Sequence, residues 1–182
     1  MPPFPPPIYL ESEAEAAAAP CERILLIEVR KSQRELVAYC EGGAELRMTA
    51  AMGREPRGHK VGVGDQRTPE GTYRVSGTLE ANRFYGFIPL DYPSQADADA
   101  ALADGRISQR DHARIGLAHA RGVTPPDDTP LGGDIGIHGE GRRWAGDSQH
   151  LDWTYGCVAV TDAELDFLAE RLEVGVEVVI LP

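Results

Sequence analysis

Residues 24–52 read ILLIEVRKSQRELVAYCEGGAELRMTAAM, and this stretch sets the fold class. The run 24–29 is almost continuously apolar, residues 31–34 are polar and turn-like, and apolar character returns at 36–39. Another such segment, 45–52, follows a pair of glycines. Apolar runs separated by short polar or glycine-containing breaks are typical of antiparallel strands joined by turns. The segment therefore predicts a meander of three antiparallel strands.

The rest of the chain adds further β signals and one late helix. Strands are also predicted at 73–76, 83–90, 134–138, 153–160 (a strand or strand-like turn) and 176–181. Thr161 followed by Glu164 forms a capping-box pattern, which is typical of a helix N-terminus. Leu165, Leu168 and Leu172 then share one side of that helix, a spacing that suits packing on a sheet. The prediction is a mostly β domain with one C-terminal helix.

Two regions differ in composition from these strands. Residues 94–121 are rich in Ala, Asp and Arg, and Ser108 with Asp111 resembles a capping box. This segment is predicted to be a helical insertion between strands and a candidate lid. Residues 1–20 are dominated by Pro, Glu and Ala, a composition that buries little apolar surface. The expected organisation is a flexible tail over 1–20 and one catalytic domain over 21–182.

Composition excludes several classes of function. The net charge of −11 argues against a nucleic-acid-binding protein and against attraction to anionic lipid. No apolar run is long enough to cross a bilayer, so no transmembrane segment is expected. The N-terminus lacks a basic segment followed by an apolar one, so it does not read as a signal peptide as it stands. The expectation is either that the sequence has no export signal or that one has been trimmed from it.

The chain has three cysteines, Cys21, Cys40 and Cys157, too few for a disulfide scaffold. A turn centred on residues 32–33 places Cys40 opposite Leu25, with Cys21 four residues further along the strand. That offset is roughly 13 Å at ~3.3 Å per residue, and a disulfide needs a Cα separation under ~7 Å. Cys21 and Cys40 are therefore predicted to be free thiols.

A histidine and a cysteine near the end of the chain suggest nucleophilic chemistry. The predicted strand 134–138 delivers His138 to a corner at Gly139, and fifteen residues separate His138 from Thr154. A thiol becomes a good nucleophile beside a base, and histidine titrates near neutrality. Gly156 lets backbone N–H groups approach a substrate carbonyl. Taken alone, these residues favour a structural cysteine.

Three ordered motifs resemble those of L,D-transpeptidase catalytic domains of the YkuD type. They are GDQRTPEGTY at 64–73, LGGDIGIHG at 131–139 and DWTYGCVAVT at 152–161. The resemblance covers roughly residues 22–182 and implies a β-sandwich or barrel-like domain with the cysteine and the histidine in one cleft. It implies no metal and no organic cofactor.

The resemblance also implies a reaction and its residues. Cys157 would attack the diaminopimelate carbonyl of a peptidoglycan stem tetrapeptide, release D-Ala and pass the acyl group from a thioester to an amine acceptor. His138 would be the base, Gly139 would orient its ring through a backbone carbonyl, and Gly156 with Cys157 would supply oxyanion N–H groups. The expected partners are peptidoglycan stem peptides, and also carbapenem β-lactams as inhibitors. The expected location is the bacterial periplasm or cell envelope.

Two positions beside the nucleophile depart from the family pattern. Tyr155 stands where a histidine is common, and Ala159 where Arg or Asn often stands. A hydrolytic relative is therefore the second hypothesis, either an L,D-carboxypeptidase or an amidase that releases wall-linked protein. A third is a non-catalytic module that binds peptidoglycan.

Other side chains have two readings each. Trp153, Thr154, Tyr155 and Tyr92 are candidates for binding substrate, or they pack the strands. His150 could replace or orient His138, or lie in a loop. A metal site formed by His138, His150 and Cys157 is allowed by ligand type, although no tight ligand spacing supports it. The remaining histidines, His59, His112 and His119, are read as surface residues.

Overall fold

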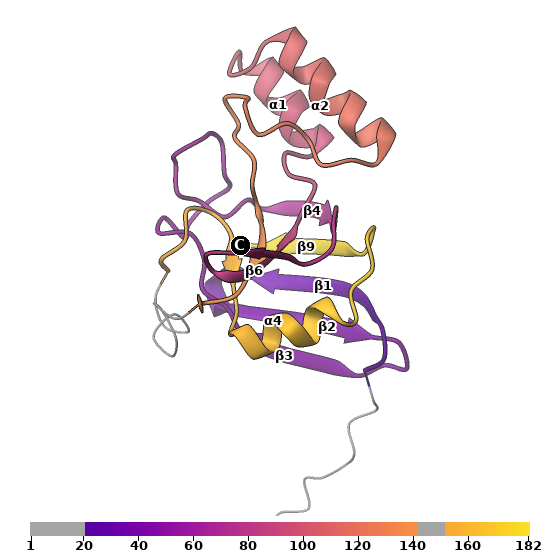
Figure 1. The fold of residues 1–182 in the computed structure, drawn as a ribbon. Coiled ribbons are helices and arrows are strands. Elements are labelled where there is room, and N and C mark those ends of the chain that lie inside the picture. Colours follow the sequence, from indigo (N-terminus) through magenta and orange to yellow (C-terminus); the bar gives the residue numbers. More distant parts are fainter. Residues whose placement is uncertain (1–20, 142–151) are drawn as a thin grey trace, which may run out of the picture.

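The computed structural model in Figure 1 describes residues 21–141 and 152–182. The predicted tail and His150 lie outside the described residues. The described chain forms two β-sheets and three α-helices. The prediction of a mostly β fold with a helical insertion and a C-terminal helix is confirmed.

The larger sheet grows from the predicted meander. Its strands, in spatial order, are β3 (Glu45–Thr49), β2 (Glu35–Cys40), β1 (Ile24–Arg30), β9 (Glu177–Leu181) and β4 (Gly71–Arg74). The meander β1–β2–β3 is antiparallel, as predicted. Strand β9, the last in the chain, pairs parallel with β1. Strand β9 therefore lies inside the sheet, between β1 and β4.

The smaller sheet carries the two motifs of interest. Its strands, in spatial order, are β5 (Glu80–Asn82), β6 (Tyr85–Pro89), β7 (Gly136–His138) and β8 (Val158–Ala159). Strands β7 and β8 are parallel, with His138 opposite Ala159. An isolated bridge between Ala51 and Ala159 ties β8 to the segment that follows β3. The histidine and cysteine motifs therefore lie on neighbouring strands, although they are separated in sequence.

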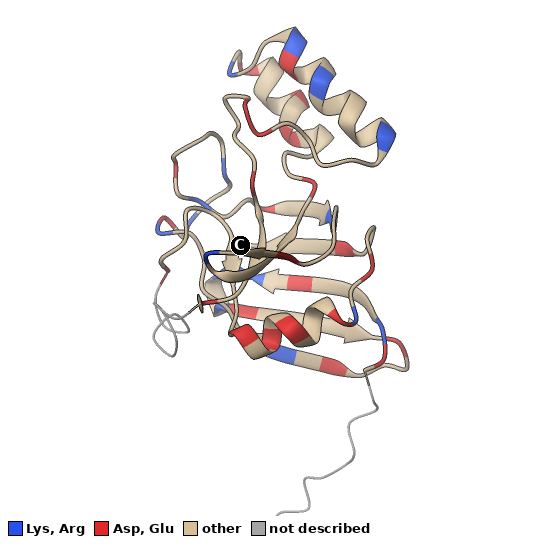
Figure 2. Cartoon of the chain, viewed as in Figure 1, with Lys and Arg blue, Asp and Glu red and all other residues tan. Residues whose placement is uncertain are grey.

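The principal core is formed by apolar side chains of both sheets and of helix α4 (Asp162–Ala169). Thr161 caps α4, and its Oγ1 accepts the N–H of Glu164 at 3.2 Å, as the capping-box pattern predicts. Leu165 and Leu168 are fully buried, so this face of the helix packs on the sheets. Acidic residues mark the remaining surface of α4 (Figure 2). The apolar side predicted for this helix is thus the side that packs on the sheets.

The helical insertion contains two helices, α1 (Gln95–Ala103) and α2 (Gln109–Arg121). Each opens with a capping box, formed by Ser94 with Asp97 and by Ser108 with Asp111. The pair builds a small core of its own from Ala98, Ala101, Ile107, Ile115 and Leu131. Figure 1 shows α1 and α2 extending beyond the sheets.

The prediction that Cys21 and Cys40 are free thiols is wrong. The two form a disulfide, with a Cα–Cα distance of 5.3 Å. The pairing of β1 with β2 shifts between Ile24 and Leu26, so Cys40 lies opposite Ile24 instead of Leu25. Strand β1 also begins only at Ile24, so Cys21 does not continue along the strand axis. A uniform register with a fully extended chain therefore overestimated the separation.

Candidate active site

A cleft of about 1230 Å³ contains both Cys157 and His138. Strand β7 supplies the histidine, and the segment leading into β8 supplies the cysteine. Other lining residues are Arg54, Lys60, Arg83, Phe84, Trp153 and Tyr155. The structure thus brings together most of the predicted site residues in one hollow.

A tight turn presents Cys157 to this cleft. The hydroxyl of Thr154 donates to the carbonyl of Cys157 at 2.7 Å, and the N–H of Gly156 donates to that hydroxyl oxygen at 3.1 Å. Gly156 has φ of +139°, and a Cβ there would lie 2.7 Å from the carbonyl oxygen of Arg67. Only glycine suits both constraints. Because the Gly156 N–H is held within the turn, it does not point to substrate in this conformation.

The segment leading to this turn is anchored by an ion pair that the sequence did not indicate. Arg34 donates from Nε and from one terminal nitrogen to Asp152, at 2.8 and 2.5 Å. Asp152 also accepts the N–H of Met52 at 3.1 Å, and the N–H of Thr154 donates back to the Met52 carbonyl. Arg34 and Asp152 are 118 residues apart in the chain. No local pattern could have paired them.

Hydrogen bonding sets the tautomer of His138. Its Nδ1 lies 2.7 Å from the carbonyl oxygen of Gly139. A carbonyl only accepts, so Nδ1 carries the proton and Nε2 is left as the basic nitrogen. Phe84 stacks on the imidazole with ring centres 4.7 Å apart, and Trp153 meets it edge-on at 5.3 Å. The ring centres of Phe84 and Trp153 are themselves 5.5 Å apart, so the three rings form one cluster that holds the imidazole in place.

The turn after His138 is fixed by Asp162, at the start of α4. One carboxylate oxygen accepts the N–H groups of Glu140 and Gly141 at 2.8 and 3.0 Å. A Cβ at Gly139 would lie 2.4 Å from this oxygen, so the position requires glycine. Asp162 is a further site-supporting residue that the sequence did not single out. Its only local signal was its place directly after the helix cap.

Both reacting groups are neutral at pH 7 in this arrangement. Burial lowers the pKa of His138, although its bond to Gly139 opposes the shift. Burial raises the pKa of the Cys157 thiol to about 11, against the stabilising N–H of Gly136. The thiol donates to the carbonyl of Asp134 at 3.2 Å. The pair is therefore a neutral thiol and a neutral imidazole, and any nucleophilic use of the sulfur requires transfer of its proton.

The predicted substrate-binding residues lie in different environments. Tyr155 is 61% exposed at the cleft, whereas Trp153 and Thr154 line it but are mostly buried. Tyr92 lies in the core, where its hydroxyl donates to the carbonyl of Leu131 at 3.1 Å. It does not line the cleft, because its ring packs against Tyr73 instead.

The three histidines read as surface residues are partly exposed and lie near carboxylates. His59 lies 3.2 Å from Asp97, and His112 lies 2.6 Å from Asp99. His119 lies 3.7 Å from Asp91. All three contacts involve residues of the insertion or of the segment leading to it. They tie this part of the chain together and lie outside the cleft lining.

The helical insertion touches one wall of the cleft without covering it. No residue of 94–121, all of which the structure describes, lines the cleft. A guanidinium nitrogen of Arg106 donates to the carbonyl of Val61 at 2.9 Å, two residues before the cleft residue Val63. A lid function for this insertion stays a prediction.

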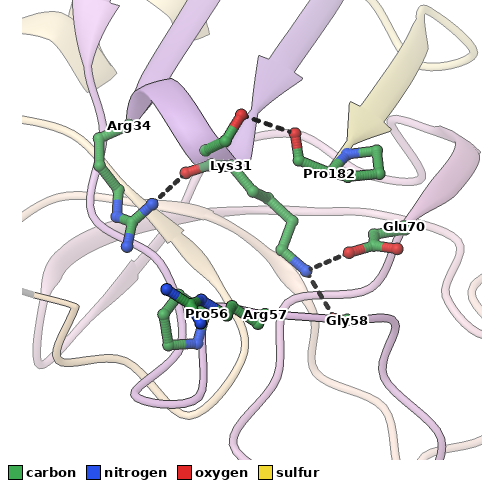
Figure 3. Close-up of a pocket in the computed structure, with 8 residues that line it drawn as sticks. Lys31, Arg34, Pro56, Arg57, Gly58, Glu70 and Pro182 are labelled. Carbon is green, nitrogen blue, oxygen red and sulfur yellow. Dashed lines mark hydrogen bonds and ion pairs between the residues drawn. The ribbon is translucent and has the colours of Figure 1, made fainter.

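A second cavity, of about 430 Å³, shares no lining residue with the cleft (Figure 3). The buried Lys31 fills one side of it, with Nζ 2.8 Å from Glu70 and 2.7 Å from the carbonyl of Gly58. Arg57, on the same wall as Pro56, is exposed. Lys31, the buried cation of this cavity, is thus already paired within the protein.

The described chain thus combines two β-sheets with a buried imidazole and a glycine-flanked thiol in one cleft. The sequence model of the L,D-transpeptidase catalytic domain, YkuD, matches residues 25–180. The chain belongs to this family.

One solved structure supports the fold, and a second one is reported with it. The helical cell shape determining protein Pgp2 from Campylobacter jejuni has a TM-score of 0.56 and 20% identity, over 86% of this chain and 47% of that one. An L,D-transpeptidase from Mycobacterium smegmatis has a TM-score of 0.49 and 10% identity, over 86% and 58% of the two chains. This chain therefore spans less than two thirds of these proteins. No curated protein matches it by sequence.

No helix in 21–141 or 152–182 is long and apolar enough to cross a membrane.

Proposed function

We propose that the protein is a cysteine-dependent peptidoglycan L,D-transpeptidase in which Cys157 is the nucleophile and His138 the base. The observation that carries this proposal is the tautomer of His138. Its Nδ1–H is committed to the Gly139 carbonyl, so Nε2 is available to accept a proton in the cleft that holds Cys157. Family membership supports stem peptides as the substrate class.

The acylation step follows from these groups. As the sulfur of Cys157 bonds to the diaminopimelate carbonyl carbon, its proton passes to Nε2 of His138. The C–N bond then breaks, and the same proton goes to the amine of the departing D-Ala. The N–H of Cys157 is the remaining oxyanion donor of the predicted pair, since that of Gly156 is held by Thr154. An acceptor amine then attacks the thioester carbon and gives a proton to Nε2 of His138, and the C–S bond breaks as the Cys157 sulfur takes that proton back.

A second candidate is hydrolysis of the same thioester, as an L,D-carboxypeptidase or an amidase that releases wall-linked protein. The observation that favours it is the open cleft, since residues 94–121 do not line it. Water reaches a thioester unless the site excludes it. The outcome depends on whether an amine docks before water attacks.

The disulfide supports a location in the periplasm or cell envelope. Disulfides form and persist in oxidising compartments and are rare in reducing ones. Cys21 and Cys40 are bonded in the structure. We therefore propose that the protein acts outside the reducing cytoplasm. Peptidoglycan is also found outside the cytoplasm.

The test is incubation with purified tetrapeptide muropeptides, followed by liquid chromatography and mass spectrometry. Cross-linked dimers together with free D-Ala support transpeptidation, and tripeptide alone supports hydrolysis. A Cys157→Ala variant is the matched control and should give neither product. Unchanged muropeptides, with a Cys157 that no carbapenem acylates, would leave only a peptidoglycan-binding module.

A further inference from the structure

Three cationic side chains of residues 21–141 and 152–182 line the cleft, and they differ in their partners. Lys60 is 4% exposed and is held by Asp65 at 2.8 Å and by the carbonyl of Gly62 at 3.1 Å. Arg54 and Arg83 form no side-chain hydrogen bond or ion pair with any residue in 21–141 or 152–182. Each is stacked on an aromatic ring instead, Arg54 on Tyr155 at 4.9 Å and Arg83 on Phe84 at 4.7 Å.

These unpaired arginines stand out because the chain is strongly acidic. It carries 29 Asp and Glu against 18 Lys and Arg, and Figure 2 shows carboxylates throughout the fold. Most other arginines of the described chain pair with one of these carboxylates, as Arg30, Arg34 and Arg114 do. Stacking on a ring orients a guanidinium while leaving its N–H groups open. Such a group is ready to receive an external carboxylate.

Arg54 is built into the segment that presents the nucleophile. Its backbone N–H donates to the carbonyl of Thr154 at 3.1 Å, and Gly53 forms a bridge with Thr154. Tyr155, under the guanidinium, is two residues before Cys157. Arg83 instead lies over Phe84, the ring that stacks on His138. Its charge helps to lower the pKa of that histidine. Only Arg54 is thus tied directly to the nucleophile's turn.

We infer that Arg54, held over Tyr155, binds the terminal carboxylate of the peptide whose carbonyl Cys157 attacks. This inference rests on the proposed function and adds to it a determinant of specificity. The residue that leaves carries this carboxylate next to the attacked amide bond, so a cation beside the nucleophile's turn suits it. A peptide that continues, or ends in an amide, offers no charge for Arg54. The enzyme would therefore remove a single terminal residue and spare internal bonds.

The test measures binding apart from turnover. In a Cys157→Ala background, calorimetry compares a tetrapeptide muropeptide with a free terminal carboxylate and the same muropeptide ending in a carboxamide. The free acid should bind about 10- to 100-fold more tightly, as is typical of a hydrogen-bonded ion pair. Arg54→Gln should reduce this preference to nearly one without changing binding of the amide. Arg54→Lys keeps the charge but lacks the paired N–H donors of a guanidinium, so it should restore part of the preference for the free acid.

Arg57→Gln is the matched control, because Arg57 is an exposed arginine of the same loop that lines the other cavity (Figure 3). It should leave the preference intact. Equal binding of acid and amide, failure of both to bind, or loss of preference in Arg83→Gln but not in Arg54→Gln would each overturn the inference. Absence of turnover in the unmodified protein would count against the proposed function instead, since binding is measured without it.

Discussion

The two sulfur sites of this protein contain the same side chain in opposite chemical states. Cys40 ends β2 beside the apolar core, and Cys21 lies close enough to bond to it. Cys157 is the free cysteine of the described chain, with a backbone carbonyl and a glycine N–H next to its sulfur. The first pair crosslinks the start of the domain, and the second site keeps a free thiol. The neighbouring residues determine whether a cysteine is a disulfide or a free thiol. In an oxidising compartment a cysteine within bonding distance of another is oxidised, whereas an isolated cysteine stays a thiol.

The largest expected effect comes from removing the isolated sulfur. Cys157→Ala should abolish turnover and carbapenem acylation while leaving the fold intact, because it deletes one atom at a partly exposed position. Intact-mass spectrometry should show one carbapenem adduct on the unmodified protein and none on the variant. Cys21→Ser/Cys40→Ser should still give one adduct. Activity that survives in Cys157→Ala would refute the assignment of the nucleophile.

The next effect concerns His138, the proposed base, which shares a cleft with Cys157 but not with the disulfide. His138→Ala should lower the acylation rate about 10²- to 10⁴-fold, the usual contribution of general-base catalysis. The measurement is the rate of adduct formation under pseudo-first-order conditions. His112→Ala is the control, since that ring contacts Asp99 of the helical insertion. A larger loss in His150→Ala than in His138→Ala would mean that the wrong histidine has been assigned.

Removing the crosslink should change stability and leave the chemistry unchanged. The disulfide joins residues 19 apart, and closing a loop of this size stabilises a fold by about 3 kcal/mol. Cys21→Ser/Cys40→Ser should therefore lower the free energy of unfolding by about that amount in urea titrations. Its rate of carbapenem acylation should match that of the unmodified protein in the absence of urea. A coupled loss of acylation would show that the two sulfur sites are not independent.

Local patterns predicted the fold well, and contacts between distant residues limited the rest. The meander, the capping boxes at Ser108 and Thr161 and the amphipathic α4 depend on residues near each other in sequence, so their patterns could be read directly. The disulfide depends on an irregular register between β1 and β2, which no alternation of apolar residues reveals. The shifted pair and the departure of residues 21–23 from the strand together reversed the prediction.

The candidate site divides in the same way. Cys157, His138 and the two glycines came from motifs, and the structure places them in or beside one cleft. Tyr92 resembled a cleft residue because it borders the insertion, but burial depends on the whole fold. The supporting pair Arg34 and Asp152 spans 118 residues and had no signal in the sequence. Arg54 was likewise one exposed arginine among many until its ring partner was known.

The pH dependence of thiol alkylation gives a smaller, graded difference between the sites. The thiolate is the reactive form, and a pKa of about 11 leaves about one Cys157 in ten thousand ionised at pH 7. Its alkylation by iodoacetamide should therefore rise roughly tenfold per pH unit between pH 7 and 9, or about 100-fold in all. Disulfide-bonded Cys21 and Cys40 should stay unlabelled throughout. A plateau before pH 9 would show that the pKa of this thiol is not raised.

The smallest expected effect comes from removing one charge, that of Asp134, near the sulfur of Cys157. Asp134 lies at φ of +52°, its carbonyl accepts the thiol proton of Cys157, and its negative charge adds to the raised pKa of that thiol. Asp134→Asn keeps the backbone carbonyl, and asparagine tolerates the left-handed conformation well. The pKa of Cys157 should fall because a neutral amide does not disfavour the thiolate. Alkylation at pH 7 should accelerate by about fivefold, since exposed charges interact by ~1 kcal/mol at contact distance. Salt at 1 M should shrink the difference between the two proteins, because it screens exposed charges. A slower reaction in Asp134→Asn, or one insensitive to salt, would mean that Asp134 acts on Cys157 through backbone geometry rather than through its charge.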